Sequence, residues 1–195
     1  MSDDQGRLPR IVAFGDSLTA GFGVAPHQAY PFLLQARLQD AGYQYTVVNA
    51  GVSGETTAGG VRRVDWILKS QPSVVILELG ANDGLRGQDL QEMASNLRHI
   101  VERFQAAKVR ILFVGMKIPP NYGQDYTMQF SETYPQIAKE LDVPLMPFFL
   151  EGVAAETELT QGDGIHPNAK GYKLIVENLL PFITPLLDCA SPRCQ

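Results

Sequence analysis

A serine near one end of the chain and an acid–histidine pair near the other could together form a nucleophilic site. Ser17 follows a short apolar run, residues 11–14, that is typical of a buried strand. Asp163 and His166 stand three residues apart in a turn, so both can point into one site. A serine hydroxyl is a poor nucleophile unless an imidazole takes its proton, and that imidazole needs an acceptor on its other nitrogen. We therefore expect Ser17 as nucleophile, His166 as general base and Asp163 as the residue that orients it.

Each of these residues also has a purely structural explanation. Asp16 and Ser17 are residue types that commonly cap a helix after a strand. Asp163 suits a turn or cap, and His166 suits a turn histidine bonded to backbone. Asp16 and Asp83 are also rival carboxylates for orienting the imidazole. Each explanation is plausible for one residue alone, but the serine and the acid–histidine pair taken together favour a nucleophilic site. The choice among the three carboxylates stays open from the residues alone.

Four short blocks resemble those of the SGNH (GDSL-type) hydrolases, in the same order over about residues 10–187. The blocks are Gly-Asp-Ser-Leu at 15–18, Asn-Ala-Gly-Val-Ser-Gly at 49–54, Gly-Ala-Asn-Asp at 80–83 and Asp-Gly-Ile-His at 163–166. Three further segments are similar to the bacterial multifunctional thioesterase, arylesterase and lysophospholipase branch, namely 79–87, 118–123 and 143–149.

The resemblance implies an oxyanion hole as well as a Ser17–His166–Asp163 triad. Its donors would be the backbone N–H groups of Ser17 and Gly54 and the side-chain amide of Asn82, because the developing oxyanion needs preorganised donors. Gly51 competes with Gly54, and the family spacing to the following threonine favours Gly54. Gly54 also suits a positive φ, and Asn82 suits a plain Asn-Asp-Gly turn.

Two loops have a composition that suits an acyl-binding surface. Residues 84–87 contain Leu85 between glycines, and residues 116–130 are rich in apolar and aromatic side chains. Several of these side chains could simply pack under the loop. Both loops, however, leave the catalytic edge of the predicted sheet, where an apolar wall can hold an acyl chain. We expect Leu85, Ile118 and Tyr122 to bind substrate, with medium or longer acyl groups preferred over acetyl.

Hydrophobic periodicity predicts strands that alternate with helices. Strands are expected at 11–14, 45–49, 73–79, 109–115 and 143–149, and helices at 28–40, 57–69, 90–104, 127–141 and 172–183, the fourth interrupted or bent at Pro135 and the second capped by Thr56 or Thr57. This alternation predicts a three-layer α/β sandwich, a central five-stranded parallel sheet covered by helices on both faces, as in flavodoxin-like folds. We expect one domain over residues 1–195, with a core at about 10–187, and motif blocks meeting where parallel strands end.

Composition narrows the functional classes further. The chain has 195 residues and a formal net charge of −5, which argues against a nucleic-acid-binding face. No apolar run approaches the roughly 18 residues of a membrane span, so no stable membrane insertion is expected. Residues 1–10 lack the apolar core of a signal peptide, which favours a cytoplasmic protein, although a trimmed periplasmic or secreted chain would look the same. Oligomeric state stays open, as does pairing of Cys189 with Cys194.

The expected function is that of a serine hydrolase without cofactor or metal. Its substrates would be small aryl or alkyl esters, acyl-thioesters or lysophospholipids, cleaved through an acyl-Ser17 intermediate. One alternative is a carbohydrate or other acetyl esterase on the same fold. Another is a non-catalytic flavodoxin-like binding module, because parallel α/β domains host many functions.

Overall fold

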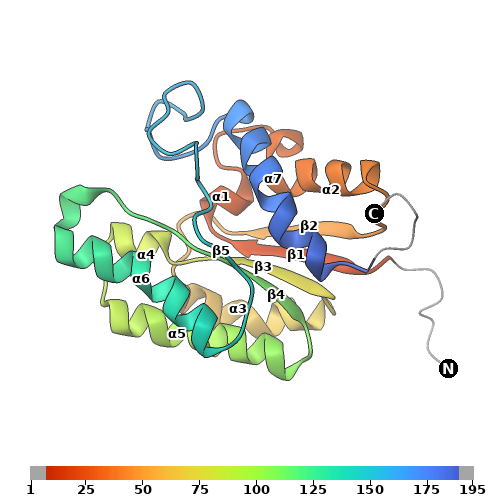
Figure 1. The fold of residues 1–195 in the computed structure, drawn as a ribbon, viewed down its shortest axis with the longest axis horizontal. Helices are drawn as coiled ribbons and strands as arrows, with labels where there is room; N and C mark the ends of the chain where they lie inside the picture. The colour runs from red at the N-terminus through yellow and green to blue at the C-terminus, as the bar shows by residue number, and fades with distance from the viewer. Residues whose placement is uncertain (1–7, 189–195) are drawn as a thin grey trace.

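The computed structural model describes residues 8–188, and Cys189 and Cys194 lie outside this range. Its centre is a five-stranded sheet in the order β2-β1-β3-β4-β5, with every neighbouring pair parallel (Figure 1). The strands are β1 Arg10–Gly15, β2 Thr46–Gly51, β3 Val74–Glu78, β4 Arg110–Val114 and β5 Leu145–Met146. The predicted five-stranded parallel sheet is confirmed.

Helices cover both faces of this sheet, which confirms the predicted three layers (Figure 1). The helices are α1 Ser17–Ala20, α2 Tyr30–Asp40, α3 Thr57–Lys69, α4 Ala81–Leu85, α5 Leu90–Ala106, α6 Gln124–Glu140 and α7 Ala169–Ile183. Helices α2 and α7 pack together over one face, and α3, α5 and α6 form the layer over the other. Within the described range, no helix is long and apolar enough to cross a membrane.

The core lies between the central strands and the two helical layers. All five residues of β3 are buried, as expected for a parallel strand covered on both faces. The apolar stripe of α5 is also buried, with Leu97, Ile100 and Phe104 fully enclosed. On the opposite layer, Tyr172 of α7 is fully buried, and its hydroxyl donates to the Leu18 carbonyl at 3.0 Å. The last helix therefore packs directly under the turn that carries Ser17.

Several element boundaries differ from the sequence prediction, and for three elements the residues explain the difference. Strand β5 has only two residues rather than the expected seven at 143–149, because Pro144 and Pro147 have no N–H to donate to a sheet. Helix α2 begins at Tyr30, since residues 26–28 form a separate 3-10 turn. Helix α6 is not interrupted at Pro135 and begins at Gln124. The neighbours of Pro135 in this helix, Phe130, Tyr134 and Ile137, are fully buried, and their packing supports the helix across the missing hydrogen bond.

Candidate active site

Ser17 is the first residue of α1 and comes two residues after the end of β1. The carboxylate of Asp16 caps this short helix by accepting a hydrogen bond from the Leu18 N–H at 3.0 Å. Gly21 ends it with a φ of 80°, a conformation that favours glycine. The capping role considered for Asp16 is therefore present, and it holds Ser17 at the carboxyl end of the sheet.

The Ser17 hydroxyl lies within hydrogen-bond distance of His166, a residue 149 positions away in the chain. The distance between Ser17 Oγ and His166 Nε2 is 2.9 Å. On the other side of the ring, His166 Nδ1 lies 2.6 Å from Asp163 Oδ2. When Nδ1 donates its proton to the Asp163 carboxylate, Nε2 is free to accept the proton of Ser17. The three side chains thus form one continuous line of hydrogen bonds.

Asp163 is held as an anion by donors from its own turn. Its Oδ1 accepts the N–H groups of Ile165 and His166 at 2.9 and 3.0 Å. Partial burial opposes ionisation of this carboxyl, but these bonds and the imidazole outweigh it and lower the pKa of Asp163 to about 2. Gly164, with a φ of 69°, supplies the left-handed conformation that brings the turn back on itself. The carboxylate is therefore charged throughout the neutral range.

Two residues that sequence reasoning missed attach the His166 turn to the Ser17 turn. Gln161 donates from its side-chain amide to the carbonyls of Phe22 and Pro167, at 2.7 and 2.9 Å. Its backbone N–H donates to the His166 carbonyl at 2.7 Å. The Phe22 ring lies against the imidazole, with 4.8 Å between ring centroids. Neither residue belongs to a catalytic motif, so the sequence offered no signal for this contact.

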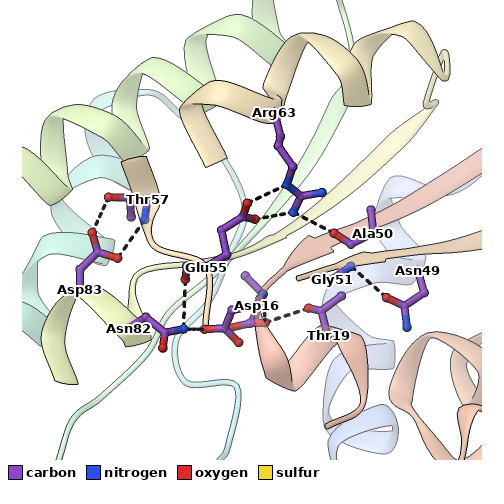
Figure 2. A network of polar contacts seen from close by, with 11 residues as sticks. Asp16, Thr19, Asn49, Ala50, Gly51, Glu55, Thr57, Arg63, Asn82 and Asp83 are labelled. Atoms are coloured by element: carbon purple, nitrogen blue, oxygen red, sulfur yellow. Dashed lines mark hydrogen bonds and ion pairs between the residues drawn. The ribbon is translucent and has the colours of Figure 1, made fainter. Parts of the chain in front are cut away.

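The two rival carboxylates have other partners. Asp83 Oδ2 accepts the Thr57 N–H at 2.9 Å, and Oδ1 accepts the Thr57 hydroxyl at 2.6 Å (Figure 2). This contact caps α3 from outside, and Thr56, the N-cap residue, makes no side-chain cap bond. The expected cap thus takes a different form, because Thr57 reaches a carboxylate from another helix.

Asp16 lies beside Ser17 in the chain and is almost completely buried. Its Oδ2 accepts a hydrogen bond from Asn82 Nδ2 at 2.9 Å (Figure 2). Burial raises the pKa of Asp16 to about 6, although the Leu18 N–H, His166 and Asn82 all favour the ionised form. Among the described residues, the hydrogen-bond partner of His166 Nδ1 is the Asp163 carboxylate and not that of Asp16.

Asn82 joins three segments of the site. Its Nδ2 donates to Asp16 and also to the Glu55 carbonyl at 3.0 Å, so both amide hydrogens are engaged (Figure 2). The Glu55 side chain in turn pairs with Arg63, which also donates to the Ala50 carbonyl at 3.0 Å. The loop that carries Gly54 is therefore fixed from both of its sides.

Gly51 and Gly54 differ in what surrounds them. The Gly51 N–H already donates to Asn49 Oδ1 at 2.9 Å, and a Cβ at Gly51 would lie only 2.7 Å from backbone atoms of Thr19 and Ala20. Gly51 is thus required by the close approach of α1. Gly54 has a φ of 79°, and no hydrogen bond from its N–H or from that of Ser17 is formed within residues 8–188.

A cavity of about 360 Å³ lies beside Ser17 and His166. Its walls are mostly apolar and include Leu18, Leu85, Met116, Ile118, Phe148 and Ile165. Two of the three expected substrate-binding residues, Leu85 and Ile118, thus line it. Tyr122 is not among the lining residues, and its hydroxyl donates to the Leu85 carbonyl at 2.8 Å. Tyr122 therefore supports the wall from behind.

Comparison with known proteins places the chain among ester-cleaving enzymes. Residues 13–174 match the GDSL-like lipase/acylhydrolase family. The chain is 40% identical over 184 residues to the esterase TesA of Pseudomonas aeruginosa, covering 94% of this chain and 92% of that protein. It is also 40% identical over 179 residues to thioesterase 1/protease 1/lysophospholipase L1 of Escherichia coli, covering 91% and 85%.

A solved structure shows the same likeness in three dimensions. The psychrotrophic esterase EstA from Pseudoalteromonas sp., in a crystal structure inhibited by monoethylphosphonate, aligns with a TM-score of 0.86 and 36% identity. The alignment covers 90% of this chain and 97% of that one.

Proposed function

The chain belongs to the GDSL-like lipase/acylhydrolase family and is a carboxylic ester hydrolase, and we propose that it works through a covalent acyl-serine intermediate on Ser17. The observation that carries this proposal is the line of hydrogen bonds from Ser17 Oγ through His166 to Asp163. These are the contacts that a serine nucleophile, a general base and an orienting acid require.

In the first half of the reaction, His166 Nε2 takes the proton of Ser17 as Oγ forms a bond to the carbonyl carbon of the substrate. Asp163 stabilises the imidazolium that results. The tetrahedral intermediate then collapses, its bond to the leaving oxygen or sulfur breaks, and His166 donates the proton to that leaving group. In the second half, a water molecule attacks the acyl-serine with His166 again as base, and the carboxylic acid is released.

The oxyanion would be held by the backbone N–H groups of Ser17 and Gly54, with Asn82 as the third donor. Because both hydrogens of the Asn82 amide are already engaged, this third bond requires one of them to be shared or turned away. The bond to the Glu55 carbonyl is the more replaceable, since the bond to the Asp16 carboxylate is charge-assisted. Asn82 would then contribute to the transition state more than to substrate binding.

We assign esters and thioesters of medium or longer acyl chains as substrates, with aryl esters and lysophospholipids included. The support for this assignment is the mostly apolar cavity beside Ser17, lined by Leu85 and Ile118. It also agrees with the names of the relatives, which are an esterase and a thioesterase/lysophospholipase. An acetyl group is too short to contact much of such an apolar wall, so the wall favours longer acyl chains.

The test is labelling with a fluorophosphonate followed by mass spectrometry of the modified peptide. Attack of Ser17 Oγ on phosphorus expels fluoride and leaves a stable phosphonyl adduct on that residue. Ser17→Ala should fold normally, take no label and lose nearly all turnover, because removing a triad member leaves only binding and oxyanion contributions. Ser53→Ala, in the neighbouring loop after β2, is the control and should behave as the wild type. An adduct on Ser53, or an active Ser17→Ala, would overturn the proposal.

A further inference from the structure

A fully buried glutamate lies directly beneath the turn that carries Ser17. Glu78 is the last residue of β3 and the register partner of Gly15, the last residue of β1. Side chains of register partners in parallel strands point to the same face of the sheet. A Cβ at Gly15 would lie 2.5 Å from Glu78 Oε2, so the carboxyl group occupies the space that a side chain at Gly15 would need.

The Glu78 carboxyl contacts the residues on both sides of the nucleophile. Its Oε2 accepts the Thr19 hydroxyl at 2.8 Å and makes a longer contact of 3.4 Å with the Asp16 N–H. Thr19, which is itself fully buried, also lies 3.3 Å from the Tyr30 hydroxyl of α2. The two residues that flank the Ser17–Leu18 pair are therefore held from below by one side chain.

Glu78 and Asp16 are both buried, and the Glu78 carboxyl group contacts the backbone of Asp16. Asp16 has two strong donors, the Leu18 N–H and the Asn82 amide. Within residues 8–188, Glu78 Oε1 has no hydrogen-bond partner. Burial first, and the charge of Asp16 second, raise the pKa of Glu78 well above its ordinary value. Of the two, Asp16 is thus better able to hold a negative charge.

We propose that Glu78 is a positioning residue whose buried carboxyl group fixes the Asp16–Thr19 turn so that Ser17 stays aligned with His166. The proposal rests on the proposed function of Ser17 as nucleophile. Glu78 itself does not contact the substrate, because it lies under the turn and does not line the cavity. Its effect reaches the reaction through Asp16 and Thr19.

The experiment compares four variants by kcat, KM and the rate of fluorophosphonate labelling at Ser17. Glu78→Met fills the same space without a hydrogen-bonding group, and Glu78→Gln keeps a neutral acceptor for Thr19. Thr19→Val removes the hydroxyl that reaches Glu78. Thr133→Val is the matched control, because that buried hydroxyl donates to the Gln129 carbonyl within α6, away from the site.

Glu78→Met should lower kcat and the labelling rate by about 10²-fold with KM almost unchanged, since small misplacements of reacting groups have effects of that size. Glu78→Gln should restore most of both rates. Thr19→Val should lower them less, and its effect should not add to that of Glu78→Met, because the two residues share one contact. Thr133→Val should retain the wild-type rates.

The proposal is overturned if folded Glu78→Met labels as fast as the wild type, or if Glu78→Gln is as slow as Glu78→Met. Should Glu78→Met fail to fold, Thr19→Val against Thr133→Val decides, and equal labelling rates in that pair also overturn it. Failure of the proposed function looks different, because wild-type Ser17 would then take no label at all.

Discussion

Asn82 donates a hydrogen bond to Asp16 Oδ2 at 2.9 Å, which ties the residue before Ser17 to the helix that follows β3 (Figure 2). The same nitrogen also reaches the Glu55 carbonyl, next to Gly54. The three segments that carry Ser17, Gly54 and Asn82 are thus linked by one amide group. A change at this amide should affect the alignment of all three.

Asn82→Ala should lower kcat by about 10²–10³-fold, the usual loss for one oxyanion donor, with little change in KM. Steady-state kinetics on an aryl ester would measure both constants. Asn96→Ala is the matched control, because the Asn96 amide donates to the Thr57 hydroxyl, in a different contact. If Asn82→Ala raises KM alone, the residue is a turn former and not an oxyanion donor.

Asp16→Asn should lower kcat although asparagine is a good helix cap. In either orientation of the new amide, its nitrogen would face a donor, the Leu18 N–H or the Asn82 amide. A partial loss of the Asn82 contribution, about 10-fold or more, is expected. Asp89→Asn is the control, because Asp89 caps α5 through one oxygen alone and tolerates an amide on the other. Equal kcat values for Asp16→Asn and Asp89→Asn would contradict the dependence of Asn82 on Asp16.

Asp16 should also give a pH dependence of stability. Its pKa is raised from 3.8 to about 6 by burial, so the unfolded chain loses this proton at lower pH than the native protein does. The stabilising contribution is fully present below pH 3.8 and is lost as the pH rises through 6. Urea unfolding from pH 4 to 7 should therefore show the wild type losing stability relative to Asp16→Asn. A difference that does not change with pH would contradict this assignment.

Asp163→Asn should fold but lose about 10⁴-fold in kcat, because the amide no longer selects the tautomer of His166 that accepts a proton at Nε2. The pKa of Asp163 is lowered to about 2, so its contribution to stability is present above pH 3.8 and lost as the pH falls through 2. Unfolding curves of wild type and variant should accordingly converge below pH 4. Asp40→Asn, at the end of α2, is the control. It should have the wild-type kcat, and its unfolding curves should stay with those of the wild type.

Ile118→Ala should weaken kcat/KM for long acyl chains and spare acetyl esters, because Ile118 lines the cavity beside Ser17. Each methylene that loses its apolar contact accounts for up to about 0.8 kcal/mol, so the effect should grow along a series of chain lengths. Aryl esters and acyl-thioesters from acetyl to long chains form the panel. Leu68→Ala on α3, which does not line the cavity, is the control. An equal loss at every chain length, or a wild-type preference for acetate, would refute the acyl-binding role.

The sequence by itself determined the order of strands and helices and the local motifs at strand ends. These features depend on periodicity and on turn chemistry, which involve neighbouring residues only. The buried run of β3 and the amphipathic stripe of α5 were predictable for this reason. The boundaries of β5, which are set by prolines, were less predictable from the sequence. A proline restricts hydrogen bonding in a sheet only once its strand has a neighbour to pair with.

Tertiary structure decided which polar groups meet. Local pattern could not choose between Asp16, Asp83 and Asp163 as the partner of His166, because each suits a turn or cap in its own segment. In the fold, the Asp83 carboxylate bonds to Thr57 and the Asp163 carboxylate bonds to His166. These pairings depend on how segments of the chain pack against one another. Glu78 belongs to an apolar strand in the sequence, and only the register of β3 against β1 places its carboxyl group against Gly15, under the turn that carries Ser17. A one-residue shift in that register would turn the same side chain to the opposite face of the sheet, so no property of the segment alone could assign it.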